Sequence, residues 1–341
     1  CDITYMPKMI YNKMPTLTIN RFKLVHPHFA MVDFYRMFTD PLLSFWRLDK
    51  TVDRFFTMQK HYPFTKVNKK ITMKPFPKPK ILEGVLRFLT QRETTIVVGF
   101  YAYNHYLEES KYSNFQYQKV EYYEIITTRF VEDGKELFAY LKSEFPEDGK
   151  DISIVEYQPF FQFTGRSAIY YYKDVPILTL YDNRKRCFPI QKVKVKTFTY
   201  KSKISPDSWI QIGPYQLTLL MALIGLMKTY VFNKRHEKEM LQAFLTNLLT
   251  IRNYYLKTSK KTIFDSSLFQ EFIVECVGDT ILPSRAKRLL IEKRKGKRMA
   301  YTYTYYPATD TFRDPKDITY KFANTSGNVV KSSKDFKINP F

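Results

Sequence analysis

Apolar residues recur along the chain with two spacings, one typical of helices and one typical of strands. Helical spacing predicts helices at 29–37, 42–60, 81–90, 102–109, 132–145, 215–233, 237–257 and 266–277. Alternating apolar and polar residues, bounded by turn residues, predict strands at 2–9, 16–25, 94–98, 120–127, 152–156, 168–172, 177–181 and 192–200. Helices and strands are interspersed in the middle of the chain, so we predict an α+β fold with a helical C-terminal region.

The segment 66–80 interrupts this pattern. Six of its residues are Lys and three are Pro, a composition typical of an extended linker. We therefore predict one domain at 1–65, a Lys/Pro linker at 66–80, a second domain at 81–235, and a helical C-terminal region with a basic tail at 236–341.

The two predicted domains contain similar segments. Residues 11–19 (YNKMPTLTI) share Tyr, Pro, Leu and Thr at a constant offset with residues 172–180 (YKDVPILTL). Residues 25–29 (VHPHF) also lead into a helix much as residues 212–216 (IGPYQ) do. These similarities indicate an internal duplication, although chance likeness between two ordinary hairpins is the alternative. In a duplicated chain, 1–65 would be the back half of a first copy whose front half precedes Cys1, and 81–235 would be a complete second copy.

The composition narrows the class of protein. Lys and Arg number 55 against 33 Asp and Glu, a formal charge of +22, while 44% of residues are apolar and 29 Phe and 27 Tyr are present. That apolar content excludes a disordered polycation, and the charge favours nucleic acid over an anionic membrane as partner, with a generally basic soluble protein as the alternative.

The cysteines and the longest apolar run indicate which structural features the chain lacks. Three Cys without a CxxC pair disfavour a disulfide framework or a cysteine zinc site, and a reducing compartment fits. The most apolar run, 217–227, is shorter than the roughly 20 residues that cross a bilayer. We therefore predict no membrane span.

The second copy has the element order of a nucleotidyltransferase: a strand, a Gly turn at a helix start, and a further strand. In such enzymes the turn and helix N-terminus hold phosphate, and two acids one residue apart place two metal ions. Gly99 is the candidate turn, but none of the ten glycines is followed by Ser or Gly. The strand after it has no acid-x-acid pair; Glu237 and Glu239 form the only such pair, in a polar helix start. We therefore predict that Gly99 marks a degenerate phosphate turn and that this copy does no catalysis.

Five short motifs carry a family resemblance through their order along the chain. They are 98–107 (VGFYAYNHYL), 123–127 (YEIIT), 161–167 (FQFTGRS), 252–255 (RNYY) and 322–328 (FANTSGN). Together they resemble the poly(A) polymerase catalytic-subunit family of large cytoplasmic DNA viruses, the giant-virus and asfarvirus branch related to the poxvirus enzyme.

This resemblance implies template-independent addition of adenylates from ATP to an RNA 3′ end, with Mg²⁺ or Mn²⁺. It also implies tandem nucleotidyltransferase-like modules, here a first one truncated at its N-terminus and a second, degenerate one. A homodimer or a viral processivity partner is expected, in the host cytoplasm at the viral factory or in the virion.

One carboxylate of this chain matches the active pattern. Asp2 lies in a segment, 1–7 (CDITYMP), that resembles the strand on which such enzymes keep their third metal carboxylate. The resemblance thus implies a catalytic and metal-binding Asp2 whose partner carboxylates are not in this chain. A frayed terminal Asp is the alternative.

Two groups of basic residues are candidates for RNA binding. Strand alternation would place Lys192, Lys194 and Lys196 on one face with Phe198 and Tyr200, giving cations beside stacking rings; a Lys-rich strand edge that discourages pairing is the alternative. A denser cluster precedes several tyrosines: Arg285, Lys287, Arg288, Lys293, Arg294, Lys295, Lys297 and Arg298. This cluster is the stronger RNA candidate of the two, with a flexible solubilising segment as the alternative.

Two other functions remain open beside polyadenylation. One is a non-catalytic module that binds RNA, and the other is a structural module of the virion. The second would show no preference for RNA over other polyanions.

Overall fold

The computed structural model describes residues 6, 8–38, 48–65, 79–161, 163–183, 188–198, 204–232, 235–263, 265–270, 276–277, 320–323 and 329–330. Its helices are α1 (Lys8–Lys13), α2 (Pro27–Phe38), α4 (Leu48–His61), α5 (Pro79–Thr90), α6 (Gly99–Ser110), α7 (Phe130–Glu144), α8 (Tyr215–Phe232) and α9 (Arg235–Ser259), with a 3-10 turn η2 (Asp148–Asp151). Its strands are β1 (Thr16–Ile19), β2 (Phe22–Val25), β3 (Thr95–Val98), β4 (Tyr123–Thr127), β5 (Ile152–Tyr157), β6 (Ser167–Tyr172), β7 (Val175–Asp182), β8 (Phe188–Pro189), β9 (Gln191–Lys194), β10 (Trp209–Ile212), β11 (Cys276–Val277), β12 (Tyr320–Ala323) and β13 (Val329–Val330).

One large mixed sheet organises the molecule, in the order β13-β12-β5-β6-β7-β4-β3-β10-β9. Strand β4 runs parallel to β7, and β10 runs parallel to β3, while β3 and β4 are antiparallel. All four residues of β3 are buried, as expected for a strand covered on both faces. The α+β class predicted from the sequence is confirmed, and the tandem arrangement of modules stays a prediction.

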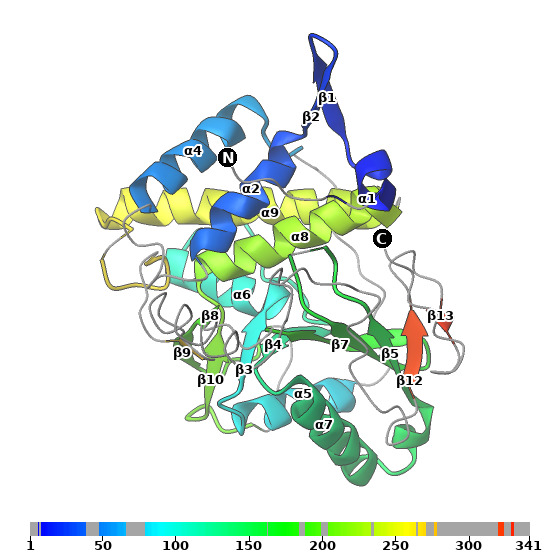
Figure 1. The fold of residues 1–341 in the computed structure, drawn as a ribbon. Helices are drawn as coiled ribbons and strands as arrows, with labels where there is room; N and C mark the ends of the chain where they lie inside the picture. The colour runs from blue at the N-terminus through cyan, green and yellow to red at the C-terminus, as the bar shows by residue number, and fades with distance from the viewer. Residues whose placement is uncertain are drawn as a thin grey trace, which may run out of the picture.

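Helices cover both faces of this sheet (Figure 1). Helices α5 and α7 lie on one face, and α6, α8 and α9 lie on the other, with α2 and α4 stacked outside α8 and α9. Helix α8 is long and apolar enough to span a membrane by composition, but 72% of it is buried among its neighbours, so it is the central core helix of this layer.

The N-terminal helices are joined to the rest by aromatic contacts. Phe29 of α2 lies 4.9 Å, between ring centroids, from Phe163. The guanidinium of Arg252, only 5% exposed, lies over the rings of Phe56 and Tyr215, 4.7 and 5.7 Å from their centroids. Residues of α2 and α4 therefore share a core with α8 and α9.

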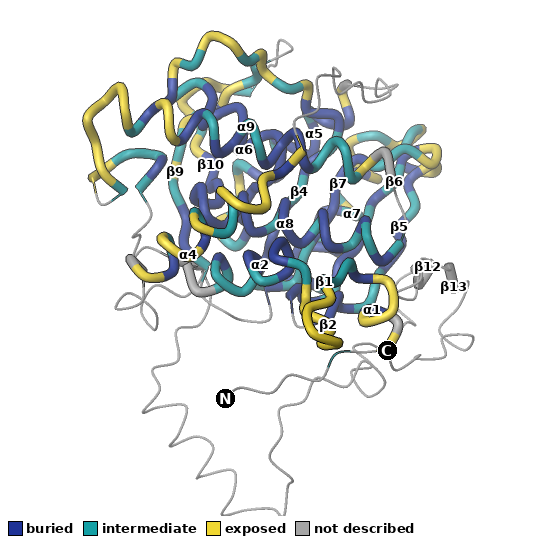
Figure 2. The backbone as a smooth tube through the Cα atoms, turned by 90° about the horizontal axis from the view of Figure 1, so that it is seen from above, coloured by how far each residue is buried: buried dark blue, intermediate teal, exposed yellow. Residues whose placement is uncertain are grey.

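The hairpin β1–β2 projects from this core (Figures 1 and 2). Directly opposite residues share a face, which puts Leu17, Leu24, Ile19 and Phe22 on one side of the hairpin. Phe22 is 72% exposed and Ile19 is 54% exposed. The structure thus has one apolar hairpin face open to solvent.

Several sequence expectations differ from the structure. The single strand expected at 16–25 is wrong, because Asn20 and Arg21 form a turn that divides it into the hairpin β1–β2. The strand expected at 2–9 is wrong at its end, because helix α1 begins at Lys8 and places Ile10 and Met14 in the core at i, i+4 spacing. The helix expected at 266–277 is wrong for 266–270 and at β11. Asp265 and Ser267 side chains accept hydrogen bonds from nearby backbone N–H groups, in turns. The strand expected at 192–200 is the shorter β9, and β10 was not predicted.

Candidate functional site

The predicted Gly turn lies between β3 and α6, at the end of a buried strand. Gly99 is the first residue of α6 and has φ +67°, a backbone conformation that favours glycine. Val98 precedes the helix and carries no polar side chain that could cap it. The strand–turn–helix geometry expected of a transferase is therefore present.

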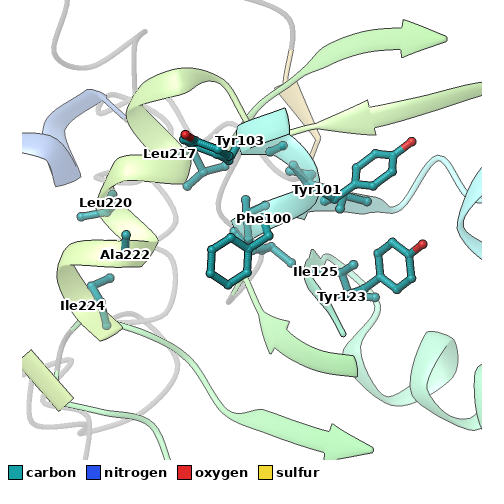
Figure 3. Close-up of a cluster of buried hydrophobic side chains, with 14 of the residues drawn as sticks. Phe100, Tyr101, Tyr103, Tyr123, Ile125, Leu217, Leu220, Ala222 and Ile224 are labelled. Atoms are coloured by element: carbon teal, nitrogen blue, oxygen red, sulfur yellow. The ribbon is translucent and has the colours of Figure 1, made fainter. Parts of the chain in front are cut away.

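The aromatic residues after this turn belong to the core. Figure 3 shows Phe100 and Tyr103 directed toward α8, with Tyr101 on the other side beside Tyr123. Phe100 lies edge-on to Phe244 of α9 at 5.2 Å between ring centroids. Phe100 thus anchors α6 to the helical layer instead of lining a phosphate site.

A carboxylate fills the space above Gly99. Glu124 of β4 lies so close that a Cβ atom on Gly99 would collide with its Oε2. The Tyr181 hydroxyl of β7 donates a hydrogen bond to this carboxylate. Burial raises the pKa of Glu124 to about 7, against the lowering effects of the Lys228 ammonium and of Tyr181. The helix N-terminus, which favours a bound anion, thus already has a carboxyl group beside it.

Asp182, the acid at the end of the neighbouring strand β7, does not join Glu124. In the parallel pairing of β4 with β7, Glu124 is the partner of Thr179, and Thr127 is the partner of Asp182. Thr127 is three positions after Glu124, an odd number, so Glu124 and Asp182 lie on opposite faces of the sheet. Over the part of the chain that the structure describes, no group of three or more His, Cys, Asp or Glu could hold a metal ion.

Asp182 has a structural partner. Arg166, 11% exposed, lies with Nη1 3.5 Å from Glu156 Oε1 and Nε 3.8 Å from Asp182 Oδ2. Its guanidinium also lies over the Phe130 ring, 5.1 Å from the centroid. These two carboxylates are therefore held by a cation in the fold.

The predicted basic strand lies at the outer edge of the sheet. Lys192 and Lys194 of β9 are exposed and alternate with partly buried residues. Lys194 pairs with Asp207 at 3.0 Å, and Lys196, beyond the strand, pairs with Glu108 at 2.7 Å. The alternation expected for these lysines is present, and their binding of RNA stays a prediction.

His105 lies beneath this edge. It is 4% exposed and lies edge-on to Phe198 at 4.9 Å between ring centroids. Burial, with a smaller contribution from the Lys196 ammonium, lowers the pKa of His105 to about 3. The imidazole is thus neutral across the physiological range.

A titration of stability tests this histidine. Its pKa is lower in the folded than in the unfolded chain, so its contribution is fully present above about pH 6.5 and is lost as pH falls toward 3. The loss is expected to reach about 1.4 kcal/mol per pH unit for this group. The free energy of unfolding, measured in urea between pH 7 and 5, should therefore have a smaller slope against pH in His105→Gln than in wild type. The control is His61→Gln, which replaces an exposed histidine. Equal slopes for His105→Gln and wild type would contradict this.

Several predicted site residues lie outside the described residues. They are Asp2 and the C-terminal cluster Arg285, Lys287, Arg288, Lys293, Arg294, Lys295, Lys297 and Arg298. Conversely, Tyr181 and Lys228 at the Gly99 turn were missed. No local sequence signal marks them, because they reach Glu124 from β7 and α8.

The chain matches two protein-family models. Residues 57–339 match the family described as "APMV, Putative poly(A) polymerase, catalytic subunit, C-terminal". The chain belongs to this family. Residues 1–44 match the poly(A) polymerase catalytic subunit family, so the resemblance predicted from the sequence is confirmed.

Individual proteins described as poly(A) polymerases or polyadenylate synthases are also similar to the chain. A "Putative poly(A) polymerase catalytic subunit" of Acanthamoeba polyphaga mimivirus is 29% identical over 98% of this chain and 62% of the relative, so the chain spans less than two thirds of that protein. The African swine fever virus protein of the same description (strain Badajoz 1971 Vero-adapted) is 32% identical over 18% of this chain and 14% of its own. The crystal structure of the Megavirus polyadenylate synthase has a TM-score of 0.76 and 26% identity, covering 98% of this chain and 68% of that chain.

Proposed function

We propose that the protein is part of a viral poly(A) polymerase that adds adenylates from ATP to RNA 3′ ends without a template. The observation that carries this proposal is the structural agreement with the Megavirus polyadenylate synthase over nearly the whole chain. Family membership over residues 57–339 and 1–44 supports it. We place it in the host cytoplasm, at the viral factory, or in the virion.

The Gly99 turn does not fit the Mg²⁺ or Mn²⁺ ions that such a reaction uses. Two-metal sites need several carboxylates on one side, whereas Glu124 is the acid at this turn and shares it with Lys228 and Tyr181. We therefore assign adenylyl transfer to residues other than this turn. Asp2 remains the proposed catalytic and metal-binding residue of this chain.

The second module would then bind RNA. A non-catalytic role for residues 81–235 is favoured by the Glu124 carboxyl group, which occupies the phosphate position at Gly99. The +22 charge supports RNA as partner. A homodimer or a viral processivity partner remains part of the proposal.

ATP incorporation onto an oligo(A) primer, with Mg²⁺ or Mn²⁺, tests the proposal. The protein expressed from its complete gene should extend the primer, Asp2→Ala should slow extension, and Glu124→Gln should leave it unchanged if the protein stays folded. Primer binding without extension would support the non-catalytic alternative. Failure to prefer oligo(A) over heparin would support a virion structural role.

The C-terminal basic cluster gives a second test. Replacing Arg288, Lys293, Arg294 and Lys297 by Gln should weaken oligo(A) binding and reduce the slope of log K against log salt by up to about 3, since each phosphate contact contributes about 0.7. A matched variant replaces Lys142, Lys150, Lys173 and Lys257 and has the same net charge. Equal slopes for the two variants would argue against phosphate contacts in the cluster.

A further inference from the structure

An exposed tryptophan lies on the same face as the basic strand. Trp209, the first residue of β10, is 55% exposed and is directly opposite Lys194 of β9. Directly opposite residues of an antiparallel pair project to the same side. The next pair along, Gln211 with Lys192, has the same orientation. The indole and two ammonium groups therefore share one surface at the end of the sheet, far from β12 and β13 (Figure 1).

Further rings continue this surface beyond β9. Phe198 follows Lys196 by two residues, and its ring lies 5.1 Å from that of Tyr117, which is 42% exposed. We call Tyr117, Lys192, Lys194, Lys196, Phe198 and Trp209 the Trp209 surface. Three lysines follow one another along it, with Trp209 opposite the second and Phe198 two residues after the third.

The tryptophan distinguishes two explanations of the lysines. An edge strand often carries Lys to prevent pairing with another sheet, which would account for Lys192 and Lys194 alone. An exposed indole beside such an edge has the opposite effect, since it adds apolar area that favours association. The combination of rings with cations is what a single-stranded nucleic acid requires, because bases stack on rings while phosphates meet the cations.

The acidic partners of these lysines do not block the surface. Lys194 and Asp207 are 53% and 84% exposed, and Lys196 and Glu108 are 47% and 38% exposed. Ion pairs this exposed contribute little to stability, because water screens their attraction. A phosphate can therefore take the place of either carboxylate at low cost.

We propose that the Trp209 surface binds single-stranded RNA, with a base stacked on the Trp209 indole and phosphates on Lys192, Lys194 and Lys196. The site rests on the proposed function only in taking RNA as the substrate. It would hold the RNA strand on the second module, at the end of the sheet formed by β9 and β10.

Tryptophan fluorescence tests the stacking directly, because the chain has only two Trp, at 46 and 209. Oligo(A) should quench the emission that is lost in Trp209→Phe, whereas inorganic polyphosphate should compete for the lysines without quenching it. In fluorescence-anisotropy titrations, Trp209→Ala should weaken oligo(A) binding about 5- to 150-fold, and Trp209→Phe should weaken it less. The matched control is Phe22→Ala, which removes an exposed ring from the β1–β2 hairpin and should leave affinity unchanged.

Three results would overturn the proposal. They are wild-type affinity in a folded Trp209→Ala variant, equal quenching by polyphosphate and oligo(A), and loss of self-association in Trp209→Ala with RNA binding intact. These measurements need no ATP. A protein that binds RNA through Trp209 without extending a primer would contradict only the polymerase, and extension with unchanged Trp209→Ala affinity would contradict only this surface.

Discussion

Replacing Arg166 with Ala is expected to lower the free energy of unfolding by about 3–5 kcal/mol. The arginine lies between Glu156 and Asp182, whose side chains are 5% and 18% exposed. Removing the cation leaves two carboxylates in a poorly hydrated site, and a buried charge without its partner is far more costly than the pair itself is stabilising. Urea unfolding measures the change.

Two further variants separate charge from packing at Arg166. Arg166→Met with Glu156→Gln removes a charge of each sign and keeps most of the volume over Phe130, so it should recover a large part of the loss. Lys173→Ala removes an exposed cation 3.2 Å from Asp151, and should cost far less than Arg166→Ala because water screens this pair. An equally small loss in Arg166→Ala would mean that water reaches both carboxylates.

Gly99→Ala is expected to cost about 2–5 kcal/mol, the sum of two effects. A left-handed backbone costs a residue with a Cβ roughly 1–2 kcal/mol, and φ at Gly99 is +67°. The added methyl group would also collide with Glu124, and overpacking of this kind costs typically 1–3 kcal/mol. Thermal or urea unfolding of the purified variant gives the value.

The two effects can be measured separately. Adding Glu124→Ala to Gly99→Ala removes the collision but keeps the backbone strain, so part of the loss should return. Gly225→Ala in α8 is the control: its Cβ would meet the flexible end of Leu241 at 3.2 Å, and helix propensity favours Ala by up to about 1 kcal/mol. A Gly99→Ala variant as stable as Gly225→Ala would show that β4 moves away from the turn.

The local pattern of apolar residues correctly predicted helices and strands whose positions depend mainly on their own residues. The helix expected at 237–257 is α9, Arg235–Ser259, and the strand expected at 94–98 is β3, Thr95–Val98. The Gly99 turn was also placed correctly, since a glycine between a buried strand and a helix is a local signal. Strand β10 was missed because four residues carry too little periodicity, and its place depends on pairing with β3 and β9.

The chemistry at the turn could be predicted only in part. The missing acid pair is visible in the sequence, and the prediction of a degenerate phosphate turn at Gly99 rests on it. The carboxylate that fills the turn could not be predicted, because Glu124, Tyr181 and Lys228 meet only after β4, β7 and α8 pack together. Trp209 was likewise missed, since its exposure depends on where β10 enters the sheet.

The packing of α2 against α8 and of Arg252 against Phe56 has a consequence for a chain cut in the Lys/Pro segment 66–80. A protease that cleaves there would sever the backbone while leaving a shared core of buried rings between the two pieces. The fragments should stay together after nicking, elute as one species under native conditions, and separate only in denaturant. The domain boundary that composition suggests at 66–80 would then not divide the molecule into two units that unfold independently.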